Sequence, residues 1–210
     1  MDSTDAADLI AEIHEDRAEN AAAESFRNRA ALLIAVLAAI LAIGGLGGGN
    51  ATDDMIANNI KASDTWAFYQ AKNVRQTTYK LAVQELEAEL AAGTLPPERR
   101  ADAEKRLQEY RATIERYDSE PDADAPNDPL RGEGKKQLSA QAKAYEEGFE
   151  TASQRDDNFD YAEVLLQLAL VLGSVAILAL NRWVLALSVA LGAVGALLTL
   201  NGFLLLVQLP

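Results

Sequence analysis

Side chains of mixed chemistry gather in the stretch SDTWAFYQAKNVRQ, residues 63–76. A solvated helix ordinarily uses Glu, Lys and Ala, whereas this stretch combines aromatic rings, cations and amides. Such a set can form a packed cluster, referred to below as the knot, because Trp and Tyr bury a large area while each keeps a group that can hydrogen-bond. It can also form a subunit contact or a ligand platform, and these readings stay open. The residues predicted to serve packing or subunit contact here are Trp66, Tyr69, Gln70, Asn73 and Gln76.

The partner of this stretch is expected on a later helix. In an antiparallel arrangement, Tyr145 and Phe149 lie at the height of Trp66 and join the same packing or subunit contact. Lys72 and Arg75 are expected to point elsewhere. If the knot packs, the face that begins at Trp66 should be mostly buried although it lies outside a membrane.

Residues able to support catalysis are scarce. The only histidine, His14, lies in an N-terminal arm, and the chain has no cysteine. The glycine run of residues 44–49 lacks the Lys-Ser/Thr of a phosphate loop, and we expect it to loosen the end of an apolar helix. Asp122, Asp124 and Asp128 resemble a calcium loop only in charge. We predict no enzyme activity and no catalytic, cofactor-binding or metal-binding residue.

Polar residues at the entry to the second apolar segment form another candidate site. Asp160, Glu163 and Gln167 follow one another there, and polar groups at such depth normally face a partner or water. Glu163 can bond an interfacial donor while Gln167 pairs across helices. Alternatively, copies from several chains form polar rings around a pore.

The composition separates into apolar and polar blocks. Residues 29–49, 161–180 and 183–207 are apolar and long enough to cross a bilayer, which takes roughly 17–25 residues. Residues 50–160 hold 15 Lys and Arg against 23 Asp and Glu. The net charge of −13 excludes nucleic acid as a partner. We therefore expect a multi-pass membrane protein whose surroundings are a lipid bilayer.

The pattern of the polar block, residues 50–160, predicts helices that form an extramembrane stalk. Apolar stripes at helical spacing occupy residues 79–90, 103–117 and 138–159. Gly93 and the Pro96-Pro97 pair predict a sharp turn, and residues 119–134 predict a loop. The fold class is thus an all-α membrane protein with three transmembrane helices and an antiparallel, coiled-coil-like stalk. We expect three stalk helices, with the first continuing span one and the third running into span two.

Small residues in the spans predict close helix packing, within or between chains. They recur at four-residue spacing in the first and third spans. These residues are Ala35 with Ala39, Ala38 with Ala42, and Ser188, Gly192 and Ala196.

Cations next to the spans predict the orientation. Arg27, Arg29 and Arg182 place the N-terminal arm and the turn between the last two spans in the cytoplasm. The stalk, residues 50–160, is then periplasmic or otherwise extracytoplasmic. The first apolar segment could be a cleaved signal, but its leader of 28 residues is long and acidic, so we expect a retained anchor.

The N-terminal arm, residues 1–28, is an acidic amphipathic segment. Its apolar positions are opposite acidic ones, and an acidic face is repelled by anionic lipid. We expect the arm to dock on a neighbouring subunit or a cytosolic partner. The apolar positions are Ala6, Leu9, Ile10 and Ile13, and the acidic ones are Asp8, Glu12, Glu15 and Glu19.

Two sequence blocks resemble a known family. They are SDTWAFYQAKNVRQTTYKLA, from Ser63, and NFDYAEVLLQLALVLGSVAILALNRWVLALSVALGAVGALL, from Asn158. Together they look like the bacterial membrane proteins grouped as domain of unknown function 4337. The resemblance implies three spans, an extramembrane helical segment and no assigned activity.

These features favour a structural or interaction role. We expect an inner-membrane homo-oligomer that acts as a scaffold, with no cofactor. The alternative is an oligomeric channel or transport accessory whose polar pore rings come from the second span.

Overall fold

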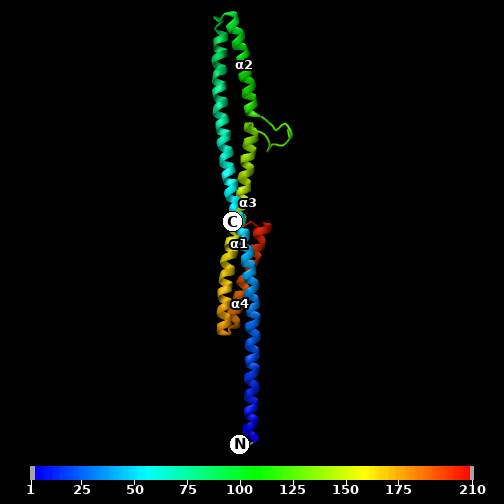
Figure 1. Cartoon of the computed structure of the whole chain (residues 1–210). Helices are drawn as coiled ribbons and strands as arrows, with labels where there is room; N and C mark the ends of the chain where they lie inside the picture. Colours follow the sequence, from blue (N-terminus) through cyan, green and yellow to red (C-terminus); the bar gives the residue numbers. More distant parts are fainter. Residues whose placement is uncertain (1–2, 209–210) are drawn as a thin grey trace. The chain divides into compact units, whose positions relative to one another are not determined.

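The computed structural model describes residues 3–208, and this part of the chain is almost entirely helical. No strand occurs among these residues, apart from one isolated bridge between Pro121 and Gly132. The expected all-helical fold is confirmed. The four helices are α1 (Ser3–Ala91), α2 (Pro97–Asp118), α3 (Lys135–Ala179) and α4 (Arg182–Leu204) (Figure 1).

The chain divides into two compact units. One, the apolar unit, consists of Met1–Asp53 and Ala152–Pro210; the other, the hairpin unit, is Asp54–Thr151. Helices α1 and α3 continue from one unit into the other without a break, as the sequence predicts. α1, α3 and α4 each contain a stretch long and apolar enough to cross a membrane.

In the apolar unit, small residues of α4 contact large ones of α1 and α3. Gly192 lies against Leu37 of α1, and Gly195 lies against Leu166 of α3. The hydroxyl of Ser188 donates to the carbonyl of Ala169 at 2.6 Å. The small-residue spacing of α4 therefore gives close packing within one chain. In this chain Ser188 and Gly192 are buried and Ala196 is half-buried, whereas Ala35, Ala38, Ala39 and Ala42 of α1 are exposed.

The glycine run of α1 is a packing surface. α1 remains helical through residues 44–49, and Gly47 is buried. A Cβ on Gly47 would lie 2.6 Å from the ring of Phe159 and 2.8 Å from that of Phe203. These two rings meet edge to face at 4.9 Å. The expectation that the glycines loosen the helix end is wrong, because α1 stays helical there and Gly47 and Gly48 pack against the ring of Phe159.

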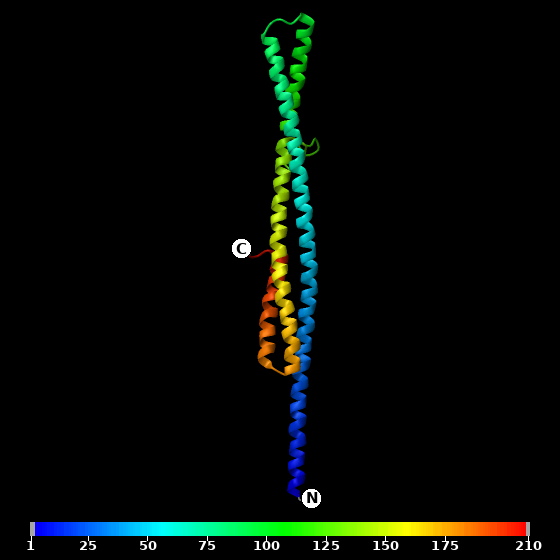
Figure 2. The same ribbon diagram turned by 90° about the vertical axis from the view of Figure 1, so that its left-hand side faces the viewer.

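In the hairpin unit, α2 and α3 pack on different lengths of α1. α2 contacts residues 76–87 of α1, where Tyr79 meets Tyr110 at a ring distance of 5.1 Å. α3 contacts residues 58–73, where the indole of Trp66 donates to Glu146 at 2.8 Å. Both views show α2 and α3 following one another along α1 (Figures 1 and 2).

The expected three-helix stalk is therefore wrong. At each height α1 packs against one helix, α2 near its C-terminal end and α3 further toward its N-terminus. The unit is therefore an antiparallel hairpin two helices thick along its whole length. The turn after α1 forms at Gly93, whose φ is +68°, and Pro97 begins α2. Both turn positions agree with the prediction, as does the loop between α2 and α3.

The packing of Phe159 against Gly47 gives a first prediction. Gly47→Ala should lower the free energy of unfolding by about 1–3 kcal/mol, because its methyl group overpacks against two rings. Gly45→Ala is the matched control: a Cβ there meets nothing within 4 Å, and Ala favours a helix. Denaturant unfolding in detergent micelles compares the variants. Equal stability of the two would contradict the packing role of Gly47.

Candidate functional site

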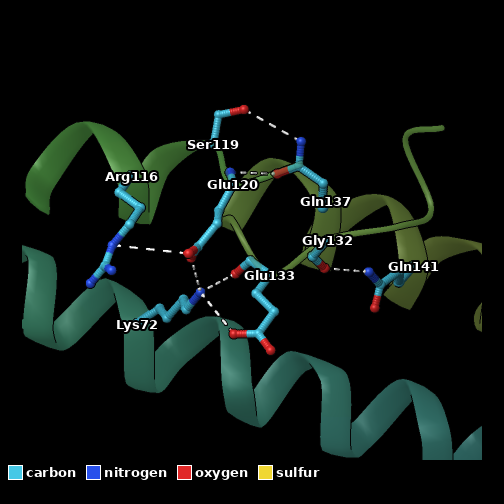
Figure 3. Close-up of polar contacts among 8 residues, drawn as sticks. All are labelled: Lys72, Arg116, Ser119, Glu120, Gly132, Glu133, Gln137 and Gln141. Atoms are coloured by element: carbon cyan, nitrogen blue, oxygen red, sulfur yellow. Dashed lines mark hydrogen bonds and ion pairs between the residues drawn. The ribbon is translucent and has the colours of Figure 1, made fainter. Parts of the chain in front are cut away.

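A buried ammonium group joins the loop after α2 to helix α1 (Figure 3). Lys72 is only 4% exposed, and its Nζ lies 3.1 Å from a carboxylate oxygen of Glu120. The same Nζ donates to the backbone carbonyl of Glu133 and lies 3.8 Å from its carboxylate. The rings of Phe68 and Tyr117 flank it, with Nζ 5.3 Å and 5.7 Å from their centres. One side chain thus holds both ends of the loop.

The ends of the loop also bind one another. The backbone N–H of Glu133 donates to the carbonyl of Glu120 at 2.9 Å, next to the bridge between Pro121 and Gly132. Gly132 has a φ of +118°, and a Cβ there would clash with the carbonyl oxygen of Glu120. Only glycine fits this approach. A loop whose ends meet in this way is an Ω-loop, a class that is frequently functional.

Two glutamines of α3 complete the neck of the loop (Figure 3). The amide oxygen of Gln137 accepts from the N–H of Glu120 at 3.2 Å, and its nitrogen donates to Ser119 at 3.4 Å. Gln141 donates to the carbonyl of Gly132 at 2.8 Å. Two of these bonds satisfy backbone groups of the loop, the N–H of Glu120 and the carbonyl of Gly132.

The acidic residues beyond the neck bond within the loop. Asp122 pairs with Arg131 at 2.8 Å and accepts from the N–H of Asp124. Asp128 accepts from the N–H of Leu130 at 2.9 Å. Across the described residues, no three His, Cys, Asp or Glu side chains gather as a metal ion requires. The loop is a surface element in which Asp122 and Asp128 bond to groups of the loop itself.

The structure spreads the predicted contact residues over several environments. Trp66 and Tyr69 meet edge to face at 5.4 Å, and both are half-buried. Asn73 accepts from Lys135 at 3.2 Å and is also half-buried. Gln76 is buried and donates to the carbonyl of Ile114 at 2.8 Å. Within one chain these residues are therefore buried to different degrees, and their role in packing or subunit contact stays a prediction.

The other predicted contact residues lie nearer the surface. Tyr145 is half-buried beneath the ammonium of Lys61, at 5.7 Å from its ring centre. Phe149 is 36% exposed, and Gln70 is exposed. Lys72, which we expected to point away, is the most buried cation of the hairpin unit among the described residues.

The polar residues at the entry to the apolar part of α3 are all exposed on this chain. Gln167 donates to Glu163 at 2.8 Å, so these two pair along one helix instead of across helices. Asp160 is exposed but slightly desolvated, and this desolvation together with the neighbouring carboxylates of Asp156 and Glu163 raises its pKa.

The same end of the apolar unit contains polar contacts that sequence reasoning missed. The buried amide of Asn158 accepts from Asn201 at 2.7 Å, and Thr52 donates to Asp156 at 2.8 Å. The contact between Asn158 and Asn201 could have been predicted from the sequence, because amides at the ends of apolar segments usually hydrogen-bond to a partner.

Little of the N-terminal arm can be compared with the prediction. α1 includes it from Ser3 onward, and Ile13 and His14 are exposed. The remaining predicted positions Ala6, Asp8, Leu9, Ile10, Glu12 and Glu15 lie outside the described side chains, whereas Glu19 is exposed.

Lys72 provides a second prediction. Lys72→Met keeps the stem but leaves Glu120 and the carbonyl of Glu133 without their donor, so the free energy of unfolding should fall by about 1–3 kcal/mol. Amide hydrogen exchange in residues 119–134 should speed up. The control is Lys80→Met, on an exposed lysine of the same helix. Unchanged exchange in the loop would show that Lys72 does not anchor it.

Comparison with known proteins adds one match. No curated protein and no solved structure matches the chain. A family model does match, with the description "Domain of unknown function (DUF4337)", and it covers residues 26–205. This range includes the three apolar stretches, the hairpin unit and the loop held by Lys72. The chain belongs to the DUF4337 family.

Proposed function

We propose that this chain is an integral inner-membrane protein that acts as a homo-oligomeric scaffold. The observation that carries the proposal is the continuity of α1. This helix runs from an apolar stretch directly into the polar hairpin, of which it is one of the helices. Such a helix couples a membrane anchor to a surface suited to protein contacts. The ordered loop on Lys72 adds a second presented element.

The proposed domains follow from this division. The arm is residues 1–28, the spans are residues 29–49, 161–180 and 183–207, and the stalk is residues 50–160. Polar residues of the hairpin unit favour its place outside the bilayer, because lipid offers no partner for their hydrogen bonds.

Charge at the two ends of the apolar unit supports one orientation. Phe26 of α1 lines one pocket together with residues 179–183, so the start of α1's apolar stretch lies beside the turn before α4. Arg27, Arg29 and Arg182 therefore gather at this end. The opposite end holds Asp156, which bonds Thr52. Cations favour the cytoplasmic side, which leaves the stalk extracytoplasmic.

Cysteine labelling tests this orientation, and the absence of native cysteine makes it direct. Ala123→Cys, in the loop of the stalk, should react with a membrane-impermeant maleimide in intact spheroplasts. Asn20→Cys, in the arm, should react only after the membrane is opened. Both positions are exposed, so accessibility within the fold does not separate them. The reverse labelling would invert the topology.

The scaffold role requires more than one copy. Mass photometry of the chain in native nanodiscs should give two or more times 22.6 kDa after correction for lipid. A single copy at physiological density would overturn the proposed role, because a scaffold of this kind is built from repeated contacts.

A second candidate is an oligomeric channel or transport accessory. One observation favours it: Glu163 and Gln167 are exposed in a stretch of α3 apolar enough to cross a membrane. Polar groups at that place are costly against lipid, and an aqueous ring would solvate them.

Conductance separates the two candidates. In planar bilayers a ring of Glu163 should favour cations, and Glu163→Gln should lower the ratio of cation to anion permeability several-fold. Asp157→Asn, on an exposed carboxylate outside the apolar stretch, is the control. A chain that conducts no better than empty lipid would remove the channel and leave the scaffold.

A further inference from the structure

Helix α1 carries an uncharged exposed stripe in the hairpin unit. Its members follow one another at alternating spacings of four and three residues, and every one of them is exposed. Ile56, Ile60, Val74 and Leu81 are the large members, at 51%, 55%, 64% and 57% exposure. We call this set the outer stripe: Ile56, Ile60, Ser63, Ala67, Gln70, Val74, Thr77, Leu81, Gln84 and Ala88.

The outer stripe has the spacing of a coiled-coil seam. Alternation of four and three residues keeps a stripe on one side of a helix that winds around a partner. α1 already uses another side for its own partners, where Ala62, Lys72, Gln76 and Leu86 are buried against α2 and α3. The helix thus has two seams, of which one is filled within the chain.

The absence of charge from the outer stripe distinguishes it from the other exposed surfaces of the unit. α2 exposes Arg99, Arg100 and Glu104, and α3 exposes Lys143 and Glu147. The chain as a whole carries a net charge of −13. Over more than 30 residues of a charged helical unit, the outer stripe admits only apolar, hydroxyl and amide side chains.

This lack of charge indicates which partner fits. Copies inserted in one membrane with one orientation present their α1 helices in parallel. In a symmetric pair each stripe residue then meets itself, so any charged member would face its like. A different protein could carry charges opposite to those of the stripe, so binding such a partner would not require the stripe to be uncharged. Anionic lipid is repelled by the acidic hairpin unit. Pairing with an identical copy, in contrast, requires an uncharged stripe.

We propose that the outer stripe is the contact between parallel copies of this chain. The inference rests on the proposed homo-oligomer and names its surface. Ile60, Val74 and Leu81 form the apolar centre, and Gln70 and Gln84 meet their own copies as amide pairs, which fix the register.

Disulfide cross-linking tests the contact in intact membranes. Val74→Cys should form a dimer of twice the chain mass on mild oxidation, since seam positions bring Cβ atoms within disulfide reach. Arg75→Cys is the matched control: Arg75 is also exposed and is the next residue along the helix, but it points about 100° away around the helix. Cross-linking of Arg75→Cys as efficient as that of Val74→Cys would contradict the seam.

Charge substitution gives an independent measurement of copy number. Val74→Glu with Leu81→Glu should convert the oligomer seen by mass photometry to smaller species, with helical circular dichroism unchanged. Arg75→Glu alters net charge by as much as the double variant but lies off the stripe, so it should keep the copy number. Loss of oligomer in both would mean that general repulsion, and not the stripe, is responsible.

The outcomes separate this inference from the proposed function. An intact oligomer in which Val74→Cys does not cross-link overturns the stripe and leaves the scaffold role. A wild-type chain that is a single copy overturns both. A cross-linked product whose mass differs from two chains identifies a different partner and overturns self-pairing.

Discussion

Positions without side chains determine how the apolar helices pack. Within a bilayer, lipid drives no hydrophobic association between helices, so packing there depends on van der Waals contact and on interhelical hydrogen bonds. The ring of Phe159 fits only because Gly47 and Gly202 leave room for it. That contact fixes the register of α1, α3 and α4, and with it the neighbours at one end, where Asn158 meets Asn201. It also decides which α1 side chains remain exposed.

The helices and turns could be predicted from the sequence, whereas their pairing could not. Gly93, Pro97 and the Pro- and Asp-rich segment after Ser119 interrupt helical patterns, so the bounds of α2 and the start of α3 follow. Apolar stripes show which side of a helix is covered but not along which length of its partner. The three-helix stalk failed for that reason, since α2 and α3 share α1 one after the other.

Lys72 shows a second limit of sequence reasoning. A buried ammonium costs several kcal/mol unless it is paired and hydrogen-bonded, so a lysine in a helix is ordinarily assigned to the surface. Its carboxylate partner, Glu120, lies 48 residues away in a loop that the sequence identifies only as polar. What decides the burial is the return of that loop over α1, which also brings the carbonyl of Glu133 to the same Nζ. Such a long-range closure leaves no local signal.

The unusual composition of residues 63–76 has a physical account in these terms. A helix that is covered on one side can carry charged residues on all its other sides. In this stretch, however, two sides of the helix hold residues other than solvated charges. Lys72 and Gln76 satisfy the loop and α2 on the inner side, while Ser63, Gln70 and Val74 occupy the outer stripe. Aromatic Trp66 lies between the two and bonds Glu146 of α3. Few positions then remain for solvated Glu and Lys, so the mixture fits a helix that packs within its own chain and, in the proposed oligomer, against a copy.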